Sequence, residues 1–146
     1  MAKSLQKEKA FTLIELMIIA AVLAILITTI VIVQKSSVIR SKNTRILAAV
    51  AEARKMAETI YLKEGTGYTT FCNNGGGFNS LTSKELDILQ KDIQDNGGSV
   101  VCWASGNSYC ASIELFGDKG FFCIDDEGHF GPTNNQICTD ENAVCP

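Results

Sequence analysis

The feature that most constrains this chain is a run of 23 almost entirely apolar residues, FTLIELMIIAAVLAILITTIVIV, from Phe11 to Val33. As a helix rising ~1.5 Å per residue, the run is roughly 35 Å long, which is enough to cross a bilayer core of ~30 Å. Its one charged residue is Glu15. A carboxylate costs on the order of 2.5–3.5 kcal/mol at the membrane centre, and less near an end, so we expect Glu15 to have a specific partner.

A second helical segment follows the apolar run without interruption. Residues 11–64 contain no proline, and six apolar residues recur at helical spacing: Ile39, Ile46, Val50, Ala53, Ala57 and Ile60. The first stop signals are Gly65 and Gly67. We therefore predict one helix over residues 12–63. Its first half (11–33) is predicted to span a membrane, and its second half (34–64) is amphipathic.

Residues 65–146 are predicted to form a small globular head outside the membrane. The segments SVVCWAS (99–105), YCASIELF (109–116) and GFFCIDD (120–126) predict three strands, and the glycine-containing segments between them predict tight turns. The strands should form an antiparallel meander. If the second turn has two residues, Ile113 pairs with Ile124 and Leu115 pairs with Phe122, on the face that the long helix covers.

A short helix is expected before the first strand. Thr82 or Ser83 would cap it, Thr82-x-x-Glu85 would form a capping box, and the helix would run to about Asp92. The segment after Gly128 has no periodicity and predicts a loop. The predicted fold is α+β, with a long N-terminal helix packed on a small antiparallel sheet and a C-terminal loop tied by disulfides.

All six cysteines lie in the head: Cys72, Cys102, Cys110, Cys123, Cys138 and Cys145. No pair has the spacing C-x-x-C, so a zinc ribbon or a thioredoxin-like redox site is poorly supported. An even number of cysteines in a small head indicates disulfides formed in an oxidising compartment. Spacing favours a local ring between Cys138 and Cys145; the alternative is a bond from the tail to a sheet cysteine such as Cys123.

The charge distribution separates a basic stalk from an acidic head. Residues 34–64 carry seven Lys/Arg and three Glu, for a net charge of +4. Residues 65–146 carry three Lys and eleven Asp/Glu, for a net charge of −8. An acidic surface repels phosphate backbones, so we expect no nucleic acid to bind the head.

The head offers little that indicates catalysis. Its single histidine, His129, has no nucleophile in a recognisable motif nearby, so we expect no enzymatic activity, no catalytic residue and no cofactor. Asp125, Asp126 and Glu127 could supply oxygen ligands to calcium. Because the EF-hand spacing is absent, a solvated acidic surface is the preferred interpretation, and no metal site is predicted.

The stretch KAFTLIELMIIAAVLAILITTIVIV (9–33) resembles the N-terminus of type IV prepilins and type II secretion pseudopilins. The resemblance implies that residues 1–10 are a cytoplasmic leader. It also implies that a prepilin peptidase/methyltransferase cuts between Ala10 and Phe11 and methylates the new N-terminus at Phe11. The family usually has glycine where this chain has Ala10. Glu15 stands at the position of the family's glutamate, which implies pairing with the Phe11 amine of a neighbouring subunit.

This resemblance implies a structural subunit of a pilus-like filament. Copies of the chain would assemble through the hydrophobic helix, with the help of an inner-membrane assembly platform. Before assembly the chain would be a single-pass protein in membrane lipid, with its head extracytoplasmic. Afterwards it would form a cell-surface or periplasm-spanning filament. One alternative is a pseudopilin of a type II secretion or DNA-uptake machine; another is a signal-anchored extracytoplasmic binding protein that never polymerises.

Overall fold

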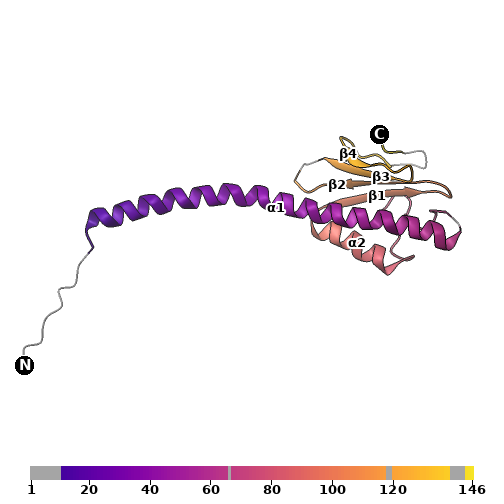
Figure 1. Ribbon diagram of the computed structural model, residues 1–146, viewed down its shortest axis with the longest axis horizontal. Helices are drawn as coiled ribbons and strands as arrows, with labels where there is room; N and C mark the ends of the chain where they lie inside the picture. The colour runs from indigo at the N-terminus through magenta and orange to yellow at the C-terminus, as the bar shows by residue number, and fades with distance from the viewer. Residues whose placement is uncertain (1–10, 66, 118–119, 139–143) are drawn as a thin grey trace, which may run out of the picture. The chain divides into compact units, whose positions relative to one another are not determined.

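The described part of the chain forms two helices and four strands. The computed structural model describes residues 11–65, 67–117, 120–138 and 144–146, without the side chains of residues 29–33 and 64. The elements in chain order are α1 (Leu13–Glu64), α2 (Lys84–Asp95), β1 (Ser99–Ala104), β2 (Tyr109–Glu114), β3 (Phe121–Asp125) and β4 (Phe130–Thr133) (Figure 1). The chain divides into two compact units, Met1–Val38 and Ile39–Pro146, so that the boundary falls inside α1.

The long helix is confirmed almost to the residue, because α1 covers Leu13–Glu64. It ends at Gly65, whose φ of 62° is a left-handed conformation that glycine adopts at little cost. The predicted apolar stripe is buried from Ile46 onward, while Ile39 is half-buried. Alanines lie at every fourth position of the buried stretch: Ala49, Ala53 and Ala57.

The sheet is an antiparallel meander in the order β1-β2-β3-β4. The three predicted strands are confirmed, but the prediction of a loop throughout the segment after Gly128 is wrong. Four of its residues form β4 against β3, beyond a turn in which the His129 N–H donates to Asp125 Oδ1 at 2.8 Å. A strand of four residues that contains Gly131 and Pro132 carries almost no β signal in its sequence.

The predicted register between the second and third strands is wrong by two residues. Ile113 lies opposite Phe122 and not opposite Ile124. The reason is a longer turn: Leu115 N donates to Gly120 O at 3.0 Å, which closes a loop of residues 116–119 in place of a two-residue turn. Residues 118–119 of this loop lie outside the described part of the chain. A shift of two residues preserves the face on which each side chain lies, so the apolar face was predicted correctly.

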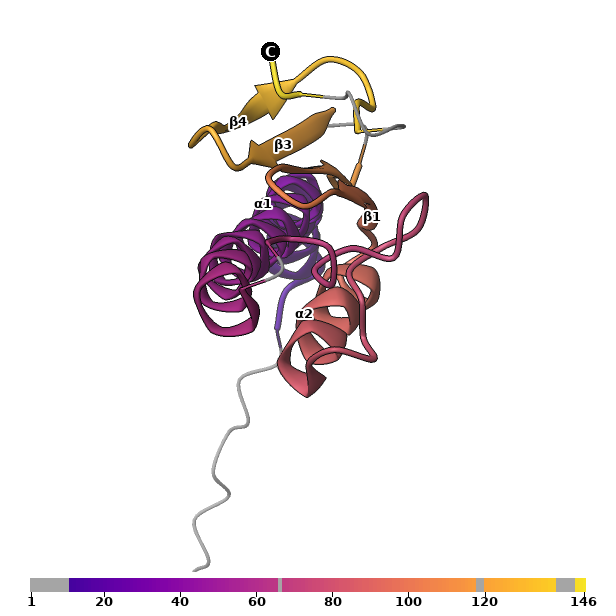
Figure 2. The ribbon, with the colours of Figure 1, turned by 90° about the vertical axis from the view of Figure 1, so that its right-hand side faces the viewer.

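One hydrophobic core fills the space between the helices and the sheet. From Ile39 onward α1 lies beside α2 on the same side of the sheet (Figures 1 and 2). The core joins the α1 stripe to Leu86 and Ile93 of α2 and to Ile113, Phe122 and Ile124 of the sheet. The C-terminal segment lies on the opposite face of the sheet, where Cys110, Cys123 and Cys138 form a second buried cluster.

The N-terminus of α2 differs from the predicted capping box. Ser83 occupies the N-cap position, and its Oγ accepts a hydrogen bond from Glu85 N at 3.2 Å. Thr82 therefore precedes the cap, and the predicted pairing of Thr82 with Glu85 is wrong. The helix runs to Asp95, three residues beyond the expected end.

Two asparagine side chains pair with backbone groups as a neighbouring strand would. Asn43 of α1 accepts from Phe116 N at 2.9 Å and donates to Phe116 O at 3.1 Å, which fixes the β2–β3 loop to the helix. Asn74 makes the same pair of contacts with Ala104 of β1, at 2.9 Å and 3.1 Å. Each amide pairs with both the N–H and the C=O of one residue, so neither backbone group is left without a partner.

A cluster of aromatic rings fills the core near the end of α1. The Tyr68 ring centroid lies 4.8 Å from that of Tyr61 and 4.8 Å from that of Tyr109, and Phe71 lies 5.0 Å from Tyr109. Burial, and then the negative charge of Glu58, raise the pKa of Tyr68 to about 12. Burial also raises the pKa of Tyr109. Both phenols are therefore held in their neutral form in the folded head.

The first prediction concerns the clamp between Asn43 and Phe116. Asn43→Ala should lower the free energy of unfolding by about 1–3 kcal/mol, because two backbone groups lose their partner. Urea denaturation followed by circular dichroism measures the loss. Ser41→Ala is the matched control: Ser41 is exposed on the same helix, and both exchanges raise helix propensity by similar amounts. If the two variants unfold at the same urea concentration, the clamp does not stabilise the head.

The second prediction concerns alkaline pH. Since the pKa of Tyr68 is raised from 10.0 to about 12 by folding, its contribution to stability is complete below pH 10 and disappears as the pH rises through about 12. The urea midpoint should therefore fall between pH 10 and 12, and it should fall less in Tyr68→Phe. Tyr61→Phe, which removes a more exposed phenol of the same cluster, is the control and should keep the full alkaline loss. Identical pH profiles for wild type and Tyr68→Phe would refute this assignment.

Candidate assembly site

The N-terminal end of α1 is closed by reciprocal contacts between Thr12 and Glu15. Thr12 Oγ1 accepts a hydrogen bond from Glu15 N, and Glu15 Oε2 accepts from Thr12 N, each at 3.4 Å. The Thr12 hydroxyl also lies 3.4 Å from Oε2. This is a capping box, in which two residues three apart satisfy each other's free backbone donors. Its sequence signature, Thr12-x-x-Glu15, was available, but the sequence analysis placed a capping box only at Thr82.

The Glu15 carboxylate keeps an acceptor for a further partner. Both contacts from Thr12 go to Oε2, and within the described residues no donor reaches Oε1. Glu15 also lies in the first turn of α1, where the helix dipole favours negative charge. The cap therefore holds a carboxylate whose Oε1 accepts no hydrogen bond from the described residues.

The surface of the first unit is apolar and exposed. Twelve large hydrophobic side chains between residues 11 and 27 are each at least 49% exposed: Phe11, Leu13, Ile14, Leu16, Met17, Ile18, Ile19, Val22, Leu23, Ile25, Leu26 and Ile27. A monomeric soluble protein rarely exposes an apolar patch of this extent, and larger patches mark interaction surfaces. This unit therefore has an interaction surface that its own chain leaves uncovered.

The prediction of a membrane-spanning segment over residues 11–33 is not supported by the structure. Among the described residues, none of the helices combines enough length with enough apolar character to cross a membrane. Residues 29–33, whose side chains are outside the description, belong to the predicted segment. The predicted leader, residues 1–10, also lies outside the described residues, and so does Ala10 of the predicted cut. Phe11 is described, and its side chain is 73% exposed.

The six cysteines form three disulfides: Cys72–Cys102, Cys110–Cys138 and Cys123–Cys145. The preferred local ring between Cys138 and Cys145 is wrong, and the alternative bond from Cys123 to the tail is confirmed. Cys110 and Cys123 both lie on the sheet face that points away from α1, so each is placed to meet the tail. Two bonds from the sheet thus fix the tail at two points.

Further hydrogen bonds fix the tail to the sheet. Asp125 is buried, and while its Oδ1 accepts from His129 N, its Oδ2 accepts from Cys145 N at 3.3 Å. Ser112 Oγ accepts from Ile137 N at 3.4 Å. One carboxylate therefore connects the β3–β4 turn to the end of the chain. This use of Asp125 was not foreseen, because the sequence analysis treated it as part of an acidic surface.

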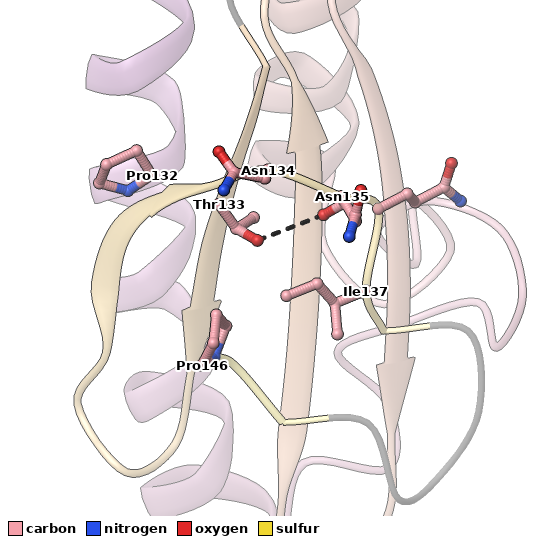
Figure 3. Close-up of a pocket in the computed structure, with 7 residues that line it drawn as sticks. Pro132, Thr133, Asn134, Asn135, Ile137 and Pro146 are labelled. Atoms are coloured by element: carbon pink, nitrogen blue, oxygen red, sulfur yellow. Dashed lines mark hydrogen bonds between the residues drawn. The ribbon is translucent and has the colours of Figure 1, made fainter.

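A pocket lies between the end of β4 and the C-terminus, with a cavity volume of about 600 Å³. It is lined by Pro132, Thr133, Asn134, Asn135, Gln136, Ile137 and Pro146 (Figure 3). The Thr133 hydroxyl donates to Asn135 O at 3.4 Å. None of these side chains is ionisable, so the pocket holds no side chain that could act as an acid or a base.

The three clustered cysteine sulfurs and the carboxylate of Asp126 have structural roles. The Cys110, Cys123 and Cys138 sulfurs lie within 4.8 Å of one another, but all three are in disulfides and offer no thiolate to a metal. Asp126 Oδ1 accepts from Tyr109 N at 3.0 Å. Asp140 and Glu141, the other acidic residues of the tail, lie outside the described residues.

Comparison with known proteins bears on the exposed helix end. A family model described as the prokaryotic N-terminal methylation motif matches residues 5–31. Over 145 residues the chain is 25% identical to the type IV wide pilus major component PilA4 of Thermus thermophilus, an alignment that covers 97% of this chain and all of that protein. Both findings support a type IV prepilin or pseudopilin family for this chain. No solved structure matches it.

The fold agrees with this assignment. A long N-terminal helix packed on a small antiparallel sheet, with disulfides in the C-terminal region, is the α+β fold of type IV pilins. The motif and the relative both support a pilin-like filament subunit at the cell surface. The individual roles of Ala10, Phe11 and Glu15 stay predictions, because nothing described here tests them.

Proposed function

We propose that this chain is the precursor of a filament subunit. A prepilin peptidase/methyltransferase removes residues 1–10 and methylates Phe11, and the mature chain polymerises through the apolar half of α1. The observation that carries this proposal is the uncovered apolar surface of residues 11–27, which has Glu15 as its one charge. Burying one Leu or Ile side chain away from water contributes about 1.5–3 kcal/mol, so these side chains are stable in lipid or in a bundle of such helices but not in water.

Glu15 gives the assembly its register in this proposal. Cleavage after Ala10 creates an amine on Phe11 of every subunit, and an arriving amine can bind the Oε1 acceptor that Thr12 leaves open. An unpaired charge inside an apolar bundle is strongly unfavourable, and a paired one is tolerated. A subunit that enters the bundle in the wrong axial register relative to its neighbours therefore buries Glu15 without a partner.

Before assembly, membrane lipid would shelter the same apolar side chains, with the leader cytoplasmic and the head extracytoplasmic. This step rests on the sequence of residues 11–33 and on the family, whose members are handed to the filament by an inner-membrane platform. The family is one of structural subunits, so we propose no enzymatic activity. The relative is a major pilus component, which favours a pilus over a secretion or DNA-uptake machine.

Mass spectrometry of the mature N-terminus tests the processing step, and electron microscopy of the cell surface tests the product. We expect a chain that begins at N-methylated Phe11, together with surface filaments. A chain that still begins at Met1 would exclude the proposal in favour of a simple anchor. Processed chains without surface filaments would favour a pseudopilin.

Glu15 variants separate its two roles. Glu15→Gln keeps an acceptor for the capping box but loses the charge, whereas Glu15→Ala loses both. We expect both variants to keep the folded head and to lose most of their filaments, measured by electron microscopy and by sheared-pilus yield. Breaking a buried ion pair costs about 3–5 kcal/mol, which is enough to abolish a weak association. If Glu15→Gln forms filaments normally while Glu15→Ala does not, the role of Glu15 is capping and not charge pairing.

The cut site makes a separate prediction. Because the family places a small residue before the cut, Ala10→Gly should be processed at least as well as wild type, and Ala10→Val should accumulate as the precursor. Immunoblots resolve the two forms by the ten-residue leader. Ala2→Val is the matched control, since it makes the same exchange far from the cut and should be processed normally. Normal processing of Ala10→Val would move the cut elsewhere.

A further inference from the structure

One of the three disulfides is more accessible than the other two. Five cysteines are buried, with 0–4% of their surface exposed: Cys72, Cys102, Cys110, Cys123 and Cys138. Cys145 is half-buried, close to the end of the chain. A thiolate from solvent must reach a disulfide sulfur to react with it, so Cys145 is where an external thiol can attack. The sulfur that leaves in that reaction is Cys123 Sγ.

Cys123 is buried directly against the second tail disulfide. Its Sγ lies 3.7 Å from Cys138 Sγ and 3.9 Å from Cys110 Sγ, which are bonded to each other. The two distances are nearly equal, so Cys123 faces the side of this bond. Thiol–disulfide exchange proceeds by attack of a thiolate on one sulfur, with the other sulfur as the leaving group. While Cys123 is bonded to Cys145, Cys123 has no thiolate. Once that bond is broken, the Cys123 side chain can rotate about χ1 until its sulfur lies in line with the Cys110–Cys138 bond.

The sheet decides which sulfur Cys123 can capture. Cys110 lies opposite Asp125 and Cys123 opposite Ser112, so the two cysteines are diagonal neighbours on adjacent strands. Diagonal Cα atoms are ~7–8 Å apart, beyond the ~7 Å that a disulfide spans without backbone movement. Cys138 lies in the irregular segment after β4, where the backbone can adjust. Exchange therefore leads to Cys138, with Cys110 as the leaving group.

We propose that Cys145 is a site of reaction with small thiols, and that its reduction passes internally from the 123–145 bond to the 110–138 bond. A thiolate RS⁻ attacks Cys145 Sγ, forming an RS–Cys145 mixed disulfide and releasing the Cys123 thiolate. This thiolate attacks Cys138 Sγ; a Cys123–Cys138 bond forms, and Cys110 leaves as a thiolate that takes up a proton. A second RS⁻ resolves the mixed disulfide. Two RSH are oxidised to RSSR, and one protein disulfide becomes the thiols of Cys110 and Cys145.

The result is a tail with one attachment in place of two. Residue 138 stays bonded to the sheet, through Cys123, while Cys145 loses its covalent bond and keeps the hydrogen bond from its backbone N to Asp125 Oδ2. The Cys72–Cys102 disulfide lies in the core on the other face of the sheet and takes no part. Thiols therefore remove the covalent attachment at Cys145 and leave residue 138 covalently attached to the sheet.

A pulse of reduced glutathione on the folded full chain tests the proposal. The reaction is quenched with acid, free thiols are alkylated, and peptides are mapped without reduction. The expected first product carries label on Cys110, with Cys145 labelled or bound to glutathione, and contains a Cys123–Cys138 peptide. Label on Cys123 with an intact Cys110–Cys138 peptide would overturn the internal exchange. Opening of Cys72–Cys102 first would overturn the assignment of Cys145 as the point of attack.

Variants test the same step without an external thiol. Cys145→Ser leaves one thiol, which should be found on Cys110 and not on Cys123. The double variant Cys110→Ser, Cys145→Ser is the control: it leaves Cys123 and Cys138 as the cysteines available to each other, and they should form a disulfide in the folded head. If they stay reduced under oxidising conditions, the proposed product bond is geometrically excluded.

Discussion

The packing of the α1 stripe against the sheet is the contact on which the rest of the head depends. Alanines at 49, 53 and 57 put small side chains at every fourth position of the buried stretch, and Ile46 and Val50 lie in the same core. A head of about 80 residues has little core to lose, and its stability is correspondingly marginal. In the first half of the same helix the apolar residues are exposed and are not covered by the described chain.

The helix and the faces of the strands could be predicted because their signals are local. Alternation along each strand also separates the cysteines: Cys102 shares the helix side with Ile113, whereas Cys110 and Cys123 lie on the other side. That parity excludes many pairings and can be read from the alternation of each strand alone. The partner of each tail cysteine could not be predicted, since it depends on how an irregular segment crosses the sheet. The register was missed because it depends on one turn, whose length glycines alone do not determine.

Outside the strand ladder, polar side chains supply the hydrogen-bond partners that backbone groups find within the sheet. Asn43 and Asn74 each pair with the N–H and the C=O of one residue, and Asp125 joins the turn before β4 to the last residues of the chain. None of these contacts can be predicted from sequence, because an asparagine or aspartate in a helix or loop has many possible partners. At the start of α1 the reverse holds: Thr12 and Glu15 are three residues apart, so their pairing was predictable from a motif of four residues.

Pro132 has a consequence for heads that are held close together. Hydrogen bonds to β3 come from alternate residues of β4, and Asp125 N pairs with His129 O, so Phe130 and Pro132 direct their backbone groups outward. A proline there offers no N–H to another strand. At the opposite edge, Gly76 O accepts from Cys102 N at 2.7 Å, so the loop before α2 already occupies β1. Many copies on one filament would experience a very high local concentration, and both edges resist the sheet-to-sheet growth that such crowding promotes.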